Sequence, residues 1–267
     1  MTEPGTIVRG RPRVPDTASL EVDDLVVRFG GLVAVDLVSL RAPAGRLTGL
    51  IGPNGAGKTT LFDACSGLNR PNGGTVRLNG EDVTSLSDSA RARRGLGRTF
   101  QRMQLFDSLT VAENVAIGRE AGLAGASPWR QVVARRGETT SVEKAVHDAL
   151  ELCGLTDFAD RRAGLLSTGQ RRLIELARVL AGDFQILLLD EPSSGLDRTE
   201  SDRFGEILQQ VVAERGIGIL LVEHDMELVM AICDYVYVIE FGRPLFDGTP
   251  EAVRSDESVR AAYLGES

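Results

Sequence analysis

Cysteine is scarce in this 267-residue sequence, and long apolar runs are missing. Cys65, Cys153 and Cys233 are widely spaced in mostly apolar surroundings, which favours reduced core thiols over a disulfide or metal framework. A membrane-spanning helix needs about 20 continuous apolar residues, so no segment is expected to span a bilayer. The first residues have no apolar core behind their charges, so we expect no secretory signal there.

An excess of basic residues is also missing. The 30 Lys and Arg residues face 38 Asp and Glu residues, which gives a formal net charge of −8. A nucleic-acid partner is therefore not expected, because proteins neutralise backbone phosphates with a basic face. The local exception is a cluster of arginines, namely Arg91, Arg93, Arg94, Arg98 and Arg102. Charge patterning favours a solvated helix face for this cluster, and a contact with a partner is the alternative.

Length and composition predict one α/β domain with a smaller helical part. Residues 1–18 are rich in Pro, Gly and Arg without apolar periodicity, so we expect a disordered tail. Residues from about 87 to 162 are mostly helical in pattern, and residues 163 to about 240 return to strand and helix alternation. The first compact portion has strand-like stretches at Ser19 to Val27, Val35 to Leu40 and Thr75 to Leu78.

A glycine-rich segment follows the apolar run Leu47 to Ile51. Residues 52–59 read Gly-Pro-Asn-Gly-Ala-Gly-Lys-Thr and fill the pattern G-x-x-x-x-G-K-[ST]. Glycines let backbone N–H groups approach phosphate oxygens, and the following helix adds its positive N-terminal end. Lys58 supplies a charge for the β- and γ-phosphates, and Thr59 supplies a hydroxyl for Mg²⁺. The predicted nucleoside triphosphate site has the candidate residues Gly52, Asn54, Gly55, Gly57, Lys58, Thr59 and Thr60.

A second apolar run ends in two carboxylates. Ile186 to Leu189 is apolar on both faces, which is typical of a central strand in a parallel sheet, and ligands lie at the carboxyl ends of such strands. Asp190 is therefore a candidate Mg²⁺ ligand, and Glu191 is a candidate base for water that attacks the γ-phosphate. Taken alone, the pair also fits two acidic residues that end a buried strand before Pro192.

A third segment has the spacing of a capping box, with Ser167 at the cap and Gln170 three residues later. Helical periodicity then continues from Arg171 to Ala181 and stops at Gly182. One interpretation is an ordinary capped helix. The other is a second anion site at the helix N-terminus, which one chain rarely needs unless two chains share a nucleotide.

Together these segments resemble the nucleotide-binding subunits of ABC transporters, from about Ser19 to the C-terminus, and Leu166 to Gln170 resembles the signature motif of that family. The resemblance implies an α/β P-loop NTPase of ABC type over residues 19–267. Such a fold has a mostly parallel sheet core, an antiparallel β subdomain and a helical subdomain of about residues 87–162. The signature residues implied to contact nucleotide are Ser167, Gly169 and Gln170. At Thr168 the family's commonest form has glycine, but this position varies within the family, so the departure leaves the implied ATP binding unchanged and makes no prediction of the turnover rate.

The same resemblance implies roles for single residues elsewhere. Phe29 matches the aromatic residue that stacks on adenine, and Gln101 matches the glutamine that contacts Mg²⁺ and the attacking water. Ser194 to Asp197 resembles the loop that crosses the dimer interface, which makes Asp197 a candidate contact to nucleotide. His224 matches the histidine that contacts the γ-phosphate.

Each of these residues also has a plainer interpretation. Phe29 by itself fits a core residue at a strand end. Gln101 by itself fits a surface amide. His224 lies between Glu223 and Asp225 and fits a solvated polar loop, although its place after an apolar strand favours a site.

The C-terminal part narrows the resemblance to the ATPase subunits of branched-chain amino-acid importers. The segments that carry this likeness are residues 99–118, 223–230, 241–243, 248–250 and 262–266. Importers of urea and short amides share much of this ending. The transported solute is therefore less firmly implied than the class of protein.

The resemblance implies that two ATPase subunits, identical or close paralogues, sandwich two ATP molecules with Mg²⁺. Two membrane permeases would dock near Gln101 at the cytoplasmic face of the membrane, and an external solute-binding protein would deliver the solute. The rivals are a soluble ABC ATPase without a transport role, a GTPase switch and a regulatory module without turnover. A guanine-reading N-K-x-D motif is absent from the sequence, which argues against the GTPase.

Overall fold

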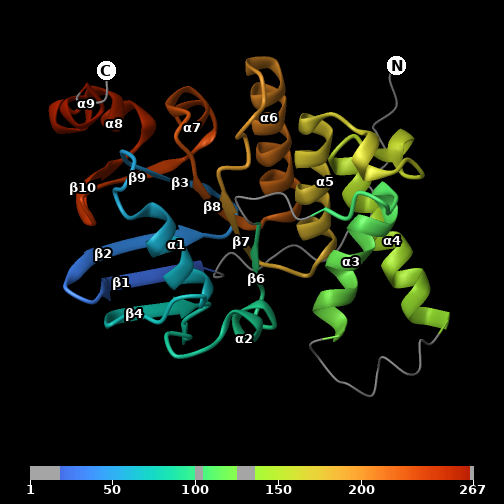
Figure 1. Cartoon of the computed structure of the whole chain (residues 1–267), viewed down its shortest axis with the longest axis horizontal. Helices are drawn as coiled ribbons and strands as arrows, with labels where there is room; N and C mark the ends of the chain where they lie inside the picture. Colours follow the sequence, from blue (N-terminus) through green and yellow to red (C-terminus); the bar gives the residue numbers. More distant parts are fainter. Residues whose placement is uncertain (1–18, 100–104, 125–135, 265–267) are drawn as a thin grey trace, which may run out of the picture.

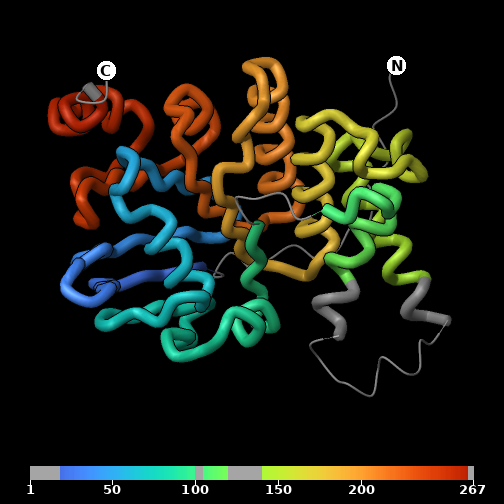
Figure 2. The backbone as a smooth tube through the Cα atoms, in the orientation of Figure 1, coloured from blue at the N-terminus to red at the C-terminus, as the bar shows by residue number. Residues whose placement is uncertain are grey.

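The computed structural model describes residues 19–99, 105–124 and 136–264. Figures 1 and 2 show two β-sheets on one side and a group of helices on the other. The strands are β1 (Ser19–Phe29), β2 (Leu32–Pro43), β3 (Leu47–Ile51), β4 (Gly73–Leu78), β5 (Glu81–Asp82), β6 (Leu96–Arg98), β7 (Ile186–Asp190), β8 (Gly218–Val222), β9 (Tyr235–Glu240) and β10 (Arg243–Gly248). The helices are α1 (Lys58–Ser66), α2 (Asp88–Ala92), α3 (Val111–Ala124), α4 (Arg136–Leu152), α5 (Thr168–Ala181), α6 (Arg198–Arg215), α7 (Met226–Ile232), α8 (Pro250–Ser255) and α9 (Glu257–Leu264), with 3₁₀ turns η2 (Thr156–Phe158) and η3 (Ala163–Leu165).

The larger sheet has six strands in the order β10-β9-β3-β8-β7-β6. Its β10–β9 pair is antiparallel and the other pairs are parallel. Every residue of β3, β7 and β8 is buried, because the two faces of these strands pack against two separate apolar clusters. In β7, Leu187 and Leu189 face one cluster while Ile186 and Leu188 face the other. The predicted mostly parallel core is thus confirmed.

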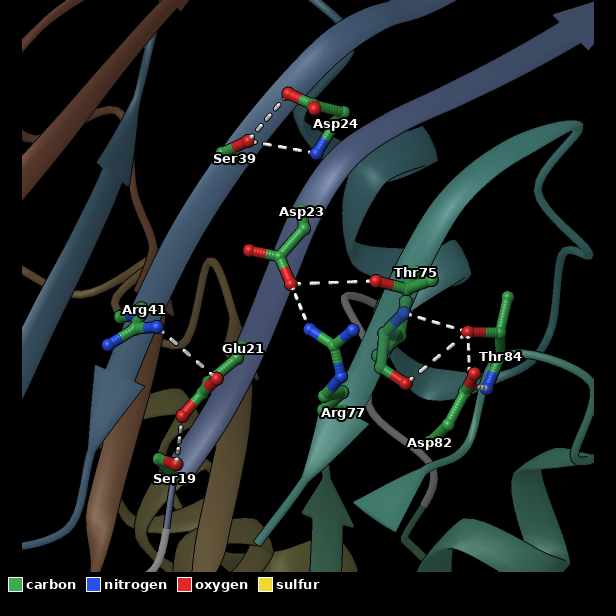
Figure 3. A network of polar contacts seen from close by, with 11 residues as sticks. Ser19, Glu21, Asp23, Asp24, Ser39, Arg41, Thr75, Arg77, Asp82 and Thr84 are labelled. Carbon is green, nitrogen blue, oxygen red and sulfur yellow. Dashed lines mark hydrogen bonds and ion pairs between the residues drawn. The ribbon is translucent and has the colours of Figure 1, made fainter. Parts of the chain in front are cut away.

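The smaller sheet is antiparallel, in the order β2-β1-β4-β5. A turn at Asn79-Gly80 joins β4 to β5, with positive φ angles of 55° and 80° at these two residues. Figure 3 shows polar pairs between neighbouring strands of this sheet, such as Arg41 with Glu21 and Arg77 with Asp23. Exposed pairs of this kind contribute little to stability, about 0–1 kcal/mol each. The sheet is held mainly by its apolar face.

Helix α1 packs between the two sheets. Its Leu61 and Phe62 are 0% exposed and lie in one cluster with side chains of β1, β2 and β4 and with the near face of β7 and β8. Full burial of a side chain of this size stabilises the fold by about 1.5–3 kcal/mol. This packing fixes the start of α1 relative to the ends of the central strands.

Helices α3, α4 and α5 pack on one another and form the group on the right of Figure 1. The range that the sequence predicts as mostly helical also contains β6, which pairs with β7 in the larger sheet. None of the helices in the described ranges is long and apolar enough to cross a membrane.

The expected solvated face of arginines is wrong at Arg91, whose exposed fraction is 1%. Its guanidinium donates hydrogen bonds to the carbonyl oxygens of Ala64 and Cys65 at 2.7 Å each, and to those of Thr84 and Leu86. Arg91 therefore closes the C-terminal end of α1. Arg93 and Arg94 are exposed as predicted, and Arg102 lies outside the described residues.

The three cysteines are buried and free, as the sequence predicts. Burial raises the pKa of each thiol to about 12, because a thiolate loses solvation in the apolar surroundings of Cys65, Cys153 and Cys233. These thiols are core side chains, since a nucleophilic cysteine needs the opposite shift.

Candidate functional site

The glycine-rich loop connects β3 to α1 at the centre of the larger sheet. A Cβ on Gly52 would stand 2.1 Å from the carbonyl oxygen of Ile239, and a Cβ on Gly57 would stand 2.5 Å from that of Ala34. Gly57 also has a φ of 97°, a conformation that costs energy for any residue with a side chain. The backbone of the loop is therefore packed against β9 and β2, and only glycine fits at these two positions.

The ammonium group of Lys58 lies inside the curve of this loop. Its Nζ donates hydrogen bonds to the carbonyl oxygens of Gly52 at 2.5 Å and Pro53 at 3.2 Å, and the residue is 7% exposed. By contrast, Asn54, Gly55 and Thr59 are exposed, and Thr60 is half-buried. The loop thus combines the buried ammonium of Lys58 with an open backbone at Gly55 and the hydroxyls of Thr59 and Thr60, a set of groups that suits phosphate oxygens.

The buried strand β7 ends in Asp190 and is followed by Glu191, so the apolar run ends in two carboxylates as predicted. Asp190 is 2% exposed, and burial raises its pKa while the guanidinium of Arg98 opposes that rise. Glu191 has a positive φ of 46°, and its N–H donates to the carbonyl oxygen of Val222 at 2.9 Å. The chain therefore turns sharply between the two residues, and the Glu191 side chain remains partly exposed.

The sequence places Arg98 in an arginine cluster for which it favours a solvated face over a contact with a partner, and the structure shows that the solvated face is wrong for Arg98 too. Its guanidinium forms ion pairs with Asp63 at 2.7 Å and Asp190 at 3.4 Å, donates to Ser66 Oγ at 2.6 Å and lies over the ring of Phe62. It links α1 to the end of β7. Arg98 ends the short strand β6, which pairs with β7 and so brings the guanidinium beside Asp190. Charge patterning could not reveal this contact, because it forms only in the tertiary structure.

His224 follows β8, the strand next to β7. Its Nδ1 lies 4.0 Å from Oε2 of Glu191 and 3.8 Å from Oε2 of Glu223. The His224 side chain is 59% exposed, whereas Glu223 is 0% exposed. The polar-loop interpretation is therefore wrong for Glu223, although it describes the exposure of His224. The structure brings His224 and Glu191 together at one edge of the sheet.

Helix α5 begins as predicted. Ser167 Oγ accepts the N–H of Gln170 at 3.2 Å, and Gln170 Oε1 accepts the N–H of Ser167 at 3.1 Å. A Cβ on Gly169 would stand 2.4 Å from Oε1 of Glu200 in α6, so a larger residue there would require the Glu200 side chain to move. Ser167 and Thr168 are exposed. Figure 1 shows α5 well away from α1, the helix that follows the glycine-rich loop.

The remaining candidates are placed as follows. Phe29, at the end of β1, is 52% exposed, so the interpretation as a core residue is wrong. Asp197 is the N-cap of α6, where its Oδ1 accepts the N–H of Glu200 at 2.9 Å. Gln101 lies outside the described residues.

Relatives identify the class of protein that this geometry defines. A model of the ABC transporter family matches residues 35–194, so the chain belongs to the ABC family and is an ATP-binding ATPase subunit. A second model, described as a branched-chain amino acid ATP-binding cassette transporter, matches residues 243–267.

Two curated relatives share this organisation over almost their whole length. The high-affinity branched-chain amino acid transport ATP-binding protein BraF of Pseudomonas aeruginosa is 43% identical over 251 residues, which cover 93% of this chain and 98% of BraF. LivG of Escherichia coli, which carries the same description, is 39% identical with the same coverage.

A solved structure agrees with the fold. An ATP-binding cassette of an ABC transporter in its ADP conformation is 32% identical, covers 93% of this chain and 99% of its own, and superposes with a TM-score of 0.82. The predicted fold class is confirmed.

Proposed function

We propose that this chain is the ATP-hydrolysing subunit of an importer for branched-chain or related amino acids. The observation that carries the proposal is the combination of an ABC cassette with a C-terminal segment that matches the branched-chain amino-acid transporters. BraF and LivG, both named for branched-chain amino acid transport, support it along nearly the whole chain. The solute itself would be recognised by other subunits.

In this proposal the glycine-rich loop holds the phosphates of ATP. The residues present fit that group, because the glycine backbone leaves an open side beside the buried ammonium of Lys58. Backbone N–H groups of the loop and the N-terminal end of α1 would bind phosphate oxygens. Phe29, which exposes its ring at the end of β1, would stack on adenine.

The carboxylates would divide the chemistry between them. Thr59 and Asp190 supply hydroxyl and carboxylate oxygens of the kind that Mg²⁺ prefers, and bound Mg²⁺ would neutralise phosphate charge. Glu191 would accept a proton from the attacking water. His224, 4.0 Å from Glu191, would contact the γ-phosphate, and Gln101 would contact Mg²⁺ and the water.

The N-terminal end of α5 would serve the nucleotide of a second subunit. Ser167, Gly169 and Gln170 form a capped helix start that lies away from the loop of the same chain. A related cassette of 23% identity is described as dimeric. In such an arrangement Asp197, at the start of α6, would lie near the shared interface and contribute to the nucleotide contacts.

The remaining partners of the proposal are membrane components. Two permeases would bind near Gln101, which would place the chain at the cytoplasmic face of the membrane as a peripheral subunit, and an external solute-binding protein would complete the importer. ATP acts in this scheme only through its higher affinity for the closed dimer.

The proposal is tested by purifying tagged Glu191→Gln protein from native membranes with Mg-ATP in mild detergent. We expect two multi-span permeases and a second ATPase subunit to co-purify. A solute screen on the reconstituted complex should then show ATP hydrolysis stimulated by branched-chain amino acids with their binding protein. If only urea or short amides stimulated hydrolysis, these compounds would be the transported solutes in place of amino acids. Recovery of soluble partners only would refute the transport role.

A further inference from the structure

Glu223 is a fully buried carboxylate that none of the assigned roles uses. Its exposed fraction is 0%, and burial raises its pKa. It follows β8 directly and precedes His224. Burying a carboxylate is costly unless hydrogen bonds compensate it, so its partners indicate what it does.

The partners of Glu223 belong to both strand ends of the site. Its Oε1 accepts the N–H of Ser193 at 2.9 Å, and its Oε2 accepts the N–H of His224 at 3.3 Å. Ser193 lies two residues after Glu191, in the loop that follows β7. One carboxylate therefore binds the backbone of the segment that carries Glu191 and the backbone of the segment that carries His224.

The His224 ring also lies beside this carboxylate. Its Nδ1 is 3.8 Å from Oε2 of Glu223 and 4.0 Å from Oε2 of Glu191. Two carboxylates on the Nδ1 side favour the tautomer in which Nδ1 carries the proton, because a hydrogen on that atom is attracted to both. Nε2 is then left as the acceptor on the other side of the ring.

The loop held by Glu223 has a second attachment on its other side. Nε and Nη2 of Arg172, on α5, each lie 3.3 Å from the carbonyl oxygen of Ser194, and Nη1 of Arg172 pairs with Glu175. Ser193 and Ser194 are thus bound from β8 and from α5. Glu223 thus binds the Glu191 segment on the side that faces His224, and Arg172 binds it on the side that faces α5.

We propose that Glu223 is a positioning residue for ATP hydrolysis, which sets the orientation of the His224 ring and the place of the Glu191 segment. It acts through these two residues and touches neither nucleotide nor water itself. The inference deepens the proposed site and rests on the roles of Glu191 and His224 in hydrolysis. It does not depend on the transported solute.

The first test compares hydrolysis by Glu223→Gln and Glu223→Ala with the parent chain. Gln keeps the size of the side chain and one acceptor oxygen, so Glu223→Gln should fold and its turnover should fall by about tenfold. Turnover of Glu223→Ala should fall by about 100-fold. The reason is that each lost buried hydrogen bond to a charged group is worth about a tenfold factor or more. The affinity for ATP should stay within about threefold, because the loss falls on positioning and not on phosphate binding. Glu227→Ala, which removes a carboxylate that is exposed in its pair with Arg198, is the matched control.

The second test observes the ring directly. The chain has two histidines, His147 and His224. His147 is exposed on α4 and lies far from His224 in the sequence, so it serves as an internal control. Imidazole ¹⁵N spectra of Glu223→Gln should show a changed tautomer population at His224 and unchanged signals at His147.

The inference is overturned if Glu223→Gln keeps turnover within about twofold of the parent, a difference too small for a positioning role. It is also overturned if turnover falls while the His224 signals stay unchanged. Neither result affects the transport role, which is tested by co-purification with permeases. Conversely, an absence of permeases leaves both measurements valid, because they use ATP and the isolated chain.

Discussion

Glu191 has a backbone φ of 46°, a conformation that few residues other than glycine adopt. The hydrogen bond from its N–H to Val222 and the attachment of Ser193 to Glu223 hold this turn. A residue in such a conformation costs about 1–3 kcal/mol and persists where surrounding contacts over-determine it. The turn directs the Glu191 side chain out of the sheet and toward His224.

Glu191→Gln should bind ATP normally and turn over about 10²–10⁴-fold more slowly, because the amide cannot accept a proton from water. Steady-state phosphate release and equilibrium ATP binding measure the two quantities. Glu206→Gln, which changes an exposed carboxylate on α6, should leave both unchanged. Near-normal turnover of Glu191→Gln would show that another group is the base.

Lys58→Ala should weaken ATP binding by about 100-fold or more, since charge-assisted hydrogen bonds to phosphate oxygens contribute about 1.5–3 kcal/mol each. Isothermal titration with ATP and Mg²⁺ measures the effect. Lys144→Ala removes an exposed lysine on α4 and provides the control. If Lys58→Ala bound ATP with unchanged affinity, the glycine-rich loop would not be part of the ATP site.

At the scale of elements, α1 carries the loop at its start and depends on Arg91 at its end. The four carbonyl oxygens that Arg91 binds include those of Ala64 and Cys65 in the last turn, and Ala64 also accepts the N–H of the C-cap residue Gly67 at 3.4 Å. A cation at this end also opposes the negative pole of the helix dipole. The contacts at the far end of α1 thus help to hold the helix whose start follows the glycine-rich loop.

Arg91→Met should lower the free energy of unfolding by about 3 kcal/mol, because it leaves buried carbonyl groups unsatisfied. Urea unfolding followed by circular dichroism measures this loss. Arg93→Met, two residues along and exposed, should change stability by no more than about 0.5 kcal/mol. Equal stability of the two variants would contradict the role assigned to Arg91.

At the scale of the whole molecule, the separation of α5 from α1 is the feature that bears on whether two chains must pair. In the proposed mechanism, the start of α5 and the glycine-rich loop before α1 lie apart in one chain (Figure 1), so they can bind the same nucleotide only when two chains pair. The helical group that carries α5 is packed through α3 and α4 and lies to one side of the sheets. Its place there would allow the start of α5 to meet a partner.

Ser167→Asp should prevent ATP-dependent pairing and leave ATP binding by each chain intact. Asp is as good an N-cap as Ser, so α5 keeps its start, but the new charge repels the partner's phosphates. Size-exclusion chromatography with light scattering, in the Glu191→Gln background with Mg-ATP, measures the pairing. Ser87→Asp changes the exposed cap of α2 and should pair as the parent does. Dimers of Ser167→Asp would place the interface elsewhere.

The sequence by itself determined the glycine-rich loop between β3 and α1, the buried strands and the start of α5, because each depends on neighbours a few residues apart. Glycine spacing, apolar runs and the Ser167–Gln170 capping box act locally, and the structure bears out β3, β7 and the cap. The family resemblance supplied the ABC fold, which the comparisons confirm.

Only the tertiary structure decided the surroundings of these segments. Arg98 meets Asp190, and Glu223 meets Ser193, across strands far apart in sequence. Charge patterning treated Arg91 as solvated because nothing local shows that the end of α1 packs over it. Side chains such as these acquire partners only when the sheet assembles, since burial and ion pairing depend on contacts between distant segments.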